Sequence, residues 1–245
     1  MIKKIKDYFR YSFLHYLFLN FKNPKYISWL KEEYLFHKKF LDKESMIFDL
    51  GANLGDKTHI FLKFSKKVIC YEPENKMFNI LSHRFKTKRV VVNKKIISNN
   101  EKNLKLLIPK DNEAYSTINE KSLKQFKHIS KNKISTQIKK STTINKEITK
   151  FGKPNYIKID CEGAEKKILE NLNFKIKIIS FELNLPYFYK DGKKILNYFS
   201  KKFNSKFNIR IHDEFKFKFK KNVNKKKCLD FLKRKKFTVE IFIFS

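Results

Sequence analysis

Four apolar runs of the sequence are each followed by residues that can take part in chemistry. The first run precedes a glycine loop at residues 51–55, and the second ends in Glu72. The third ends in Asp160-Cys161-Glu162, and the fourth ends in Glu182. Glycines let a ligand approach the backbone closely, and a carboxylate can accept a hydrogen bond or a proton. Because ligands of open α/β sheets bind beyond the carboxyl ends of the strands, we expect these residues to share one site.

The glycine loop lies within a strand, loop and helix pattern in residues 47–64. Gly51 and Gly55 allow a tight turn, and Asn53 between them is one of the few other residues that tolerate a left-handed backbone. Asp56 can cap a helix whose apolar residues follow at helical spacing. The free N–H groups and positive dipole end of that helix favour a ligand held by the loop. An ordinary strand-to-helix turn is the alternative.

Glu72 strengthens the prediction of a bound nucleotide. It follows a second apolar strand, about 20 residues beyond the glycine loop, where an acid of a nucleotide-binding βαβ unit accepts hydrogen bonds from ribose hydroxyls. A solvated surface residue is the alternative. Asp160 and Glu162 are expected beside whatever the glycine loop holds, and their alternative role is to cap the helix that follows.

The elements that must position these residues alternate between strands and helices. A helix is predicted at residues 28–42, and strands and helices then alternate up to a third strand, Val90 to Ile97, which Ser98 closes. This alternation predicts an α/β fold with a doubly wound, parallel sheet. Two apolar runs at residues 207–211 and 237–244 predict a terminal antiparallel pair. The alternating Phe215, Phe217 and Phe219 predict an exposed edge strand before the last run.

Residues 101–150 interrupt the alternation. Short alternating runs at 104–108 and 134–138 flank a polar stretch with a predicted helix at 122–128. We predict an excursion that forms a lid or a substrate-facing hairpin, with an unspecialised insertion as the alternative. The predicted organisation is therefore a helical extension over residues 1–44 and one domain over residues 45–245.

The composition limits the classes of function. Of 245 residues, 57 are Lys or Arg, and the net charge is +33. Such a charge fits nucleic-acid or membrane binding, but it also fits a drift toward residues of A+T-rich codons. Arginine, which suits bidentate recognition of phosphates and bases, occurs at only five positions, so the drift is favoured. Three cysteines without metal spacing indicate reduced thiols in a cytoplasmic protein.

The first 21 residues are basic and rich in aromatic side chains. They lack the apolar core and cleavage site of a signal peptide, and they are too short to cross a bilayer. We predict an amphipathic helix that docks on its own domain or, alternatively, makes a peripheral contact with an anionic membrane.

Three ordered motifs resemble those of the FkbM family of S-adenosylmethionine-dependent methyltransferases. They are Ile-Phe-Asp-Leu-Gly-Ala-Asn-Leu-Gly at 47–55, Tyr-Glu-Pro at 71–73 and Ile-Lys-Ile-Asp-Cys-Glu-Gly-Ala-Glu at 157–165. The resemblance covers residues 45–183, more than half of the chain. It implies a Rossmann-like, class I methyltransferase fold with a seven-stranded sheet whose last strand is antiparallel. It also implies O-methyl transfer from S-adenosylmethionine to a hydroxyl of a sugar, glycan or glycan-like metabolite.

The resemblance also implies roles for residues of this chain. The glycine loop would hold the methionine part of the cofactor, and Glu72 would bind the ribose hydroxyls. The cofactor-binding residues predicted in this way are Asp49, Gly51, Asn53, Gly55, Glu72 and Ser98. Asn145 stands where an acid is expected, so no role is assigned to its turn.

The methyl-transfer site needs a group that takes the proton of the acceptor hydroxyl. We predict Asp160 or Glu162 as this base, with Glu182 as a third candidate. A second carboxylate can position the hydroxyl or hold a divalent ion, and no metal ligand set is predicted.

Two alternatives to this function remain at the level of the sequence. Asn184-Leu185-Pro186-Tyr187 resembles the Asn-x-Pro-Tyr signature of adenine N6-methyltransferases, which with the positive charge suggests RNA methylation. It follows the predicted strands one strand too late for that signature. A nicotinamide-binding Rossmann protein is the other alternative, but Asn53 replaces the middle glycine of its loop.

Overall fold

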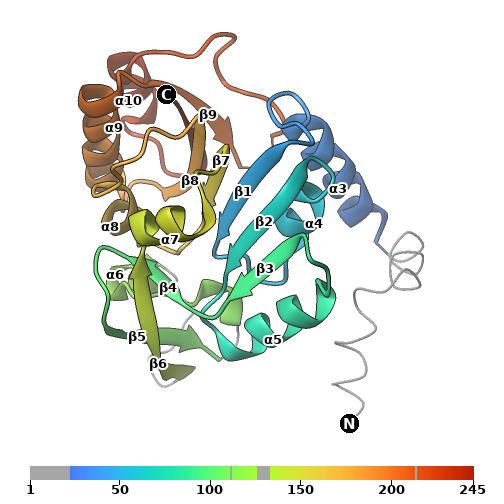
Figure 1. The fold of residues 1–245 in the computed structure, drawn as a ribbon. Coiled ribbons are helices and arrows are strands. Elements are labelled where there is room, and N and C mark those ends of the chain that lie inside the picture. The colour runs from blue at the N-terminus through green and yellow to red at the C-terminus, as the bar shows by residue number, and fades with distance from the viewer. Residues whose placement is uncertain (1–22, 111, 126–132, 213) are drawn as a thin grey trace.

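The computed structural model describes residues 23–110, 112–125, 133–212 and 214–245. The predicted helix within the first 21 residues lies outside these ranges. The described part contains a seven-stranded sheet with helices on both faces, and a smaller three-stranded sheet below it in Figure 1.

The large sheet has the predicted doubly wound order. In spatial sequence its strands are β3 (Val90–Asn93), β2 (Ser65–Tyr71), β1 (Ser45–Leu50), β7 (Tyr156–Ile159), β8 (Ile178–Asn184), β10 (Thr238–Phe244) and β9 (Lys206–Ile211). The first five pair in parallel, and β10 runs antiparallel to both β8 and β9. The central strand β1 is buried along its whole length, as expected of a parallel sheet covered on both faces. The class I sheet with an antiparallel last strand is therefore confirmed.

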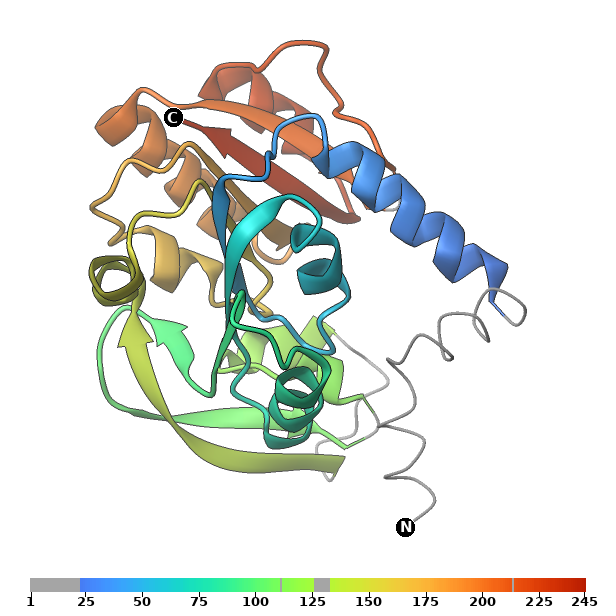
Figure 2. The same cartoon turned by 45° about the vertical axis from the view of Figure 1, so that its right-hand side comes forward.

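Helices cover the two faces of the large sheet (Figures 1 and 2). One face carries α3 (Pro24–His37), α4 (Asp56–Phe61) and α5 (Asn75–Arg84), and the other carries α7 (Ile144–Phe151), α8 (Glu165–Leu169), α9 (Tyr189–Phe203) and α10 (Lys225–Leu232). A hydrophobic core lies on each face of the sheet, and alternate residues of one strand point into the two cores. Tyr156 packs with the α3 and α4 side, whereas Ile157 packs with the α7 to α9 side.

The predicted third strand is two strands, which corrects the sequence prediction. The chain leaves the large sheet after β3, and β4 (Ile96–Ser98) belongs to the smaller sheet. Lys94 and Lys95 separate the two apolar runs, and Lys95 Nζ lies 3.6 Å from Glu147 Oε1. These two lysines interrupt the apolar run. Because β3 is the edge strand of the large sheet, it can end here without exposing buried side chains of a neighbouring strand.

The predicted excursion contains an antiparallel hairpin. Its strands are β5 (Asn103–Pro109) and β6 (Ile134–Thr143), and β6 also pairs in parallel with β4. Between them lie a short helical turn, η1 (Glu113–Tyr115), and helix α6 (Glu120–Gln125). Part of the helix predicted at 122–128 lies outside the described residues.

The prediction of an edge strand at Phe215, Phe217 and Phe219 is wrong. This segment forms no strand, and the ring of Phe217 packs edge-to-face on Phe36 and Phe242. The alternation of phenylalanine and lysine therefore reflects a covering segment with rings inward and lysines outward. The antiparallel pairing of β9 and β10 is confirmed, although helix α10, which the sequence analysis did not predict, lies between them.

Candidate active site

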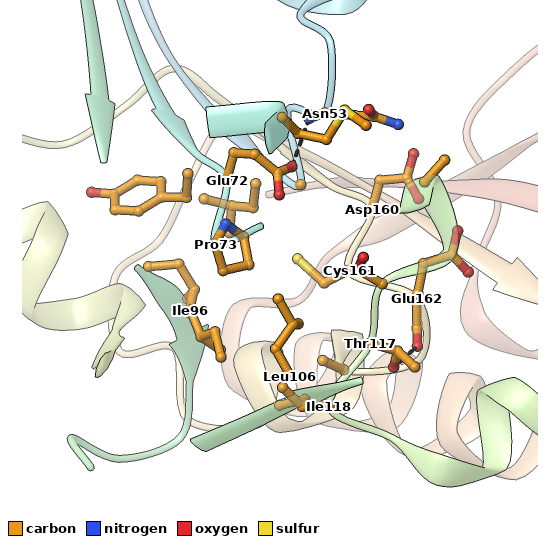
Figure 3. Close-up of a pocket in the computed structure, with 18 of the residues that line it drawn as sticks. Asn53, Glu72, Pro73, Ile96, Leu106, Thr117, Ile118, Asp160, Cys161 and Glu162 are labelled. Atoms are coloured by element: carbon orange, nitrogen blue, oxygen red, sulfur yellow. Dashed lines mark hydrogen bonds between the residues drawn. The ribbon is translucent and has the colours of Figure 1, made fainter. Parts of the chain in front are cut away.

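A cavity of about 250 Å³ lies where the carboxyl ends of the central strands face the smaller sheet. Its wall contains six residues singled out from the sequence, namely Gly51, Asn53, Glu72, Asp160, Glu162 and Glu182. Figure 3 shows Asn53, Glu72 and Asp160 along one side of the cavity and Leu106 and Ile118 along the other. The structure thus brings the glycine loop and all three acidic strand ends to one place.

The glycine loop owes its shape to close contact with its neighbours. Gly51 has a φ of +77°, and a Cβ added there would lie 1.8 Å from the backbone oxygen of Asp160. Gly51 is therefore required because the loop packs directly on the segment that follows β7. At Gly55 an added Cβ would lie 2.5 Å from atoms of Leu81 and Phe85, so this glycine serves the packing of α5, and it lies outside the cavity wall.

Asn53 adopts the left-handed backbone that its residue type permits, with a φ of 49°. Its side-chain Oδ1 is buried without a hydrogen-bond partner among the described residues, although the residue lines the cavity. A buried acceptor without a donor is costly. A ligand that donates an N–H or O–H here would satisfy it.

Glu72 connects the glycine loop to the end of β2. Its Oε2 accepts a hydrogen bond from the Asn53 backbone N at 2.8 Å, and its Oε1 accepts one from the Glu74 backbone N at 2.9 Å. Burial raises the pKa of this carboxyl to about 7. Each carboxylate oxygen can accept a further hydrogen bond, so Glu72 can bind ligand hydroxyls while it holds the loop.

Besides Gly55, two further predicted cofactor-binding residues, Asp49 and Ser98, lie outside the cavity wall. Asp49 is fully buried beneath the loop, where its Oδ2 accepts a hydrogen bond from Thr58 Oγ1 at 2.6 Å. Ser98 is buried in β4, and its hydroxyl lies 3.3 Å from Asn99 Oδ1. Ile96 and Ile97 of the same strand line the cavity instead. Ser98 was expected at the end of a strand of the large sheet, whereas β4 belongs to the smaller one.

The acidic loop after β7 is fixed from both sides. Glu162 has a φ of 49°, and its backbone oxygen accepts a hydrogen bond from Thr117 Oγ1 at 2.7 Å. Asn119 Nδ2 donates to the Gly163 oxygen at 2.8 Å. From the other side, Glu165 Oε1 accepts from the backbone N of Cys161 at 3.0 Å. The excursion between β5 and β6 thus holds the loop that carries the predicted catalytic acids.

Sequence reasoning missed these supporting residues. Glu165 belongs to the quoted third motif, where its place just after the loop glycine could have suggested a capping role. Thr117 and Asn119 lie in a polar stretch with no periodic pattern. Only the fold brings them to a loop more than forty residues away.

The acids at the cavity differ in their surroundings. Lys158 Nζ donates to Asp160 Oδ2 at 3.0 Å. Burial raises the pKa of Glu162 and of Glu182, and the negative charge of Asp160 raises both further. The two glutamates therefore favour their neutral forms near pH 7.

One part of the wall is apolar and suits a flat aromatic ring. Figure 3 shows Pro73, Ile96, Leu106 and Cys161 around the centre of the cavity. An adenine ring placed among them would be buried by hydrophobic contacts, with its ribose near Glu72.

The comparison with known families decides the identity of the chain. The profile of the methyltransferase FkbM domain matches residues 49–233. The chain belongs to the FkbM methyltransferase family. It is therefore an S-adenosylmethionine-dependent methyltransferase. The hydrogen-bond acceptors on Asn53 and Glu72 and the apolar surfaces of the cavity fit that cofactor.

Two of the solved structures with a similar fold are described as methyltransferases. A precorrin-6y C5,15-methyltransferase from Geobacter metallireducens has a TM-score of 0.47 at 7% identity, covering 87% of this chain and 88% of that one. A tRNA (m1A58) methyltransferase from Aquifex aeolicus has a TM-score of 0.45 at 11% identity, covering 88% and 68%. No curated protein matches the sequence. Similarities at this level say nothing about the acceptor.

Two further observations concern the described part of this FkbM methyltransferase. None of its helices combines the length and apolarity that crossing a membrane requires. No group of three or more His, Cys, Asp or Glu side chains in that part is arranged to hold a metal ion.

Proposed function

We propose that this FkbM methyltransferase methylates a hydroxyl of a sugar, glycan or glycan-like metabolite. The acidic end of the cavity, formed by Asp160, Glu162 and Glu182, carries this proposal. A hydroxyl acceptor needs a group that takes its proton, which a carboxylate can do.

Different residues of the cavity would bind different parts of the cofactor. Glu72 would accept hydrogen bonds from its ribose hydroxyls, and Asn53 Oδ1 would accept one from its amino group. When bound, S-adenosylmethionine supplies a methyl group on a positively charged sulfur. The acceptor oxygen would form a bond to that methyl carbon as the carbon–sulfur bond breaks with its electron pair on sulfur, and the hydroxyl proton would pass to a base of this chain.

Asp160 is the residue we propose as the base for that proton. Lys158 occupies its Oδ2. Among the hydrogen bonds of the described residues none reaches its Oδ1, which can therefore accept from the acceptor hydroxyl. Glu162 and Glu182, which favour their neutral forms, would position the acceptor by donating hydrogen bonds to it.

The arrangement around Asn184 supports the choice of a hydroxyl acceptor over a nucleobase. Asn184 is the last residue of β8, and its Oδ1 accepts a hydrogen bond from Thr238 Oγ1. It lies outside the wall of the cofactor cavity. Its place therefore gives no support to the resemblance of residues 184–187 to the adenine methyltransferase signature.

We also propose a cytoplasmic location. All three cysteines are free thiols, and Cys70 and Cys228 are buried in the core. Reduced thiols fit a reducing compartment, in which S-adenosylmethionine is also made available to enzymes.

Transfer of a labelled methyl group tests the proposed acceptor class. The purified protein would be incubated with methyl-labelled S-adenosylmethionine and, in parallel, with a panel of saccharides or with total RNA. We expect alkali-stable label in at least one saccharide, because methyl ethers resist alkali, with one S-adenosylhomocysteine formed per methyl transferred. Label confined to RNA would overturn the proposal.

A further inference from the structure

A second cavity of about 230 Å³ adjoins the first. Both cavities are lined by Asp160 and Glu182, so these two carboxylates stand between them. The second cavity lies on the α3 and α4 side of the sheet, and Trp29 of α3 and Lys57 at the start of α4 form part of its wall. A molecule in it would reach the proposed base from the side opposite the cofactor.

The floor of the second cavity is a network of paired charges. Arg210 Nη1 and Nη2 donate to the two carboxylate oxygens of Glu33 at 2.9 and 2.8 Å. Arg210 Nε lies 3.0 Å from Glu240 Oε2, and Lys57 pairs with Glu33 Oε1. The side chain of Glu33 is 1% exposed and that of Arg210 is 10% exposed, so the network is held firmly in place.

This network sits on one face of the sheet in register. Glu182 on β8 is opposite Glu240 on β10, and Glu240 is opposite Arg210 on β9. The nearby Lys158 is paired with Asp160. Among the described residues of the wall, each lysine and arginine is paired with a carboxylate, so the wall has fixed hydrogen-bonding groups of both charges. A phosphate or carboxylate ligand would have to compete with those carboxylates, whereas neutral hydroxyl groups can donate and accept along the same wall.

Trp29 gives this polar cavity an apolar wall. Its ring is half-buried, with Lys57 Nζ 5.0 Å from its centroid. Indole rings bury large apolar area and pack well against the C–H groups of a sugar ring, while the surrounding polar groups bond its hydroxyls. One aromatic wall with a ring of donors and acceptors is thus chemistry suited to an uncharged sugar.

We propose that the second cavity is the acceptor site and that it takes an uncharged sugar ring. The sugar packs against Trp29, bonds the Glu33, Arg210 and Glu240 network, and presents one hydroxyl between Asp160 and Glu182. This inference rests on the proposed function, and it adds the place of the acceptor and its lack of charge.

The chain contains a single tryptophan, so its fluorescence reports directly on this cavity. With the protein saturated with S-adenosylhomocysteine, methyl glycosides of neutral hexoses, glucuronic acid and a short RNA would be titrated separately. We expect a saturable change of Trp29 emission with at least one neutral glycoside and none with glucuronic acid or RNA. A response to the anionic ligands alone, or to none of the set, would overturn the inference.

Kinetics with a saccharide that is methylated separate this inference from the proposed function. Trp29→Ala should raise KM for the saccharide by about tenfold, with kcat and affinity for S-adenosylhomocysteine changed less than about twofold. Leu35→Ala, on the same helix but 42% exposed, is the matched control and should change none of these values. If methyl transfer occurs and Trp29→Ala leaves KM unchanged, the acceptor lies elsewhere and only the proposed function survives.

Discussion

The substitution Glu72→Gln tests how the cofactor is held. The amide keeps one acceptor oxygen but replaces the other with an NH2 donor, and it loses the charge that strengthens the hydrogen bonds from Asn53 N, Glu74 N and the ribose hydroxyls. A hydrogen bond to a charged group contributes about 1.5–3 kcal/mol. Loss of one such bond to the ligand predicts about 10- to 150-fold weaker binding of S-adenosylhomocysteine.

The pH dependence of binding provides an independent measure of the same contact. Because burial raises the pKa of Glu72 to about 7, the free protein carries a carboxylate above that pH and a neutral acid below it. Ribose hydroxyls donate stronger hydrogen bonds to the ionised Glu72 carboxylate than to the neutral acid, so the ligand binds the ionised protein more tightly. Affinity should therefore fall by about tenfold between pH 8 and pH 6 in the wild-type protein. The Glu72→Gln variant should lack this dependence.

Isothermal titration with S-adenosylhomocysteine at both pH values is the assay. Glu74→Gln is the matched control, because it removes one carboxylate two residues away that caps α5 through Met77 N at 2.8 Å and lies outside the cavity wall. Its affinity should stay within about threefold of wild type. The assignment of Glu72 to the ribose would be refuted if Glu72→Gln bound S-adenosylhomocysteine as tightly as the wild-type protein. It would also be refuted if the affinity of Glu72→Gln fell between pH 8 and pH 6 as much as that of Glu74→Gln.

Three further predictions concern the loop, the base and stability. Gly51→Ala should lower the free energy of unfolding by about 2–4 kcal/mol in urea, and Gly152→Ala by less, because both have positive φ but only Gly51 meets a backbone oxygen at 1.8 Å. Asp160→Asn should reduce kcat by about 10²- to 10⁴-fold with unchanged S-adenosylhomocysteine affinity by calorimetry, and full turnover would exclude it as base. Burial raises the pKa of Glu182 above its unfolded value, so it favours the folded state at low pH and this contribution is lost as pH rises. Thermal melts should therefore show Tm falling between about pH 5 and pH 8, and less steeply in Glu182→Gln.

The parts of the site that were predictable from the sequence are those with local patterns. The glycine loop, Glu72 and the Asp160 to Glu162 loop each follow a buried strand, and parallel strands place their carboxyl ends at one edge. Their convergence therefore follows from the order of elements alone. Ser98 was placed through a strand that the lysines at 94 and 95 divide, so an error in one element moved the residue to another sheet.

The remaining features depend on contacts that no local pattern encodes. Thr117 reaches Glu162 across 45 positions, and Arg210 reaches Glu33 across 177. At Phe217 a local pattern is present but misleading. The alternation of phenylalanine and lysine predicts a strand, whereas the segment forms none and the Phe217 ring packs in the core beneath α3. Period-two patterns arise wherever a chain covers a core in an extended form.

The contact between Gly51 and the carbonyl of Asp160 has a consequence for how this enzyme can change. The segment proposed to bind the methyl donor and the segment that carries the proposed base touch through main-chain atoms, so neither can move without moving the other. New acceptors would have to be accommodated by remodelling α3 or the β5–β6 excursion, while the geometry between methyl donor and base is inherited intact.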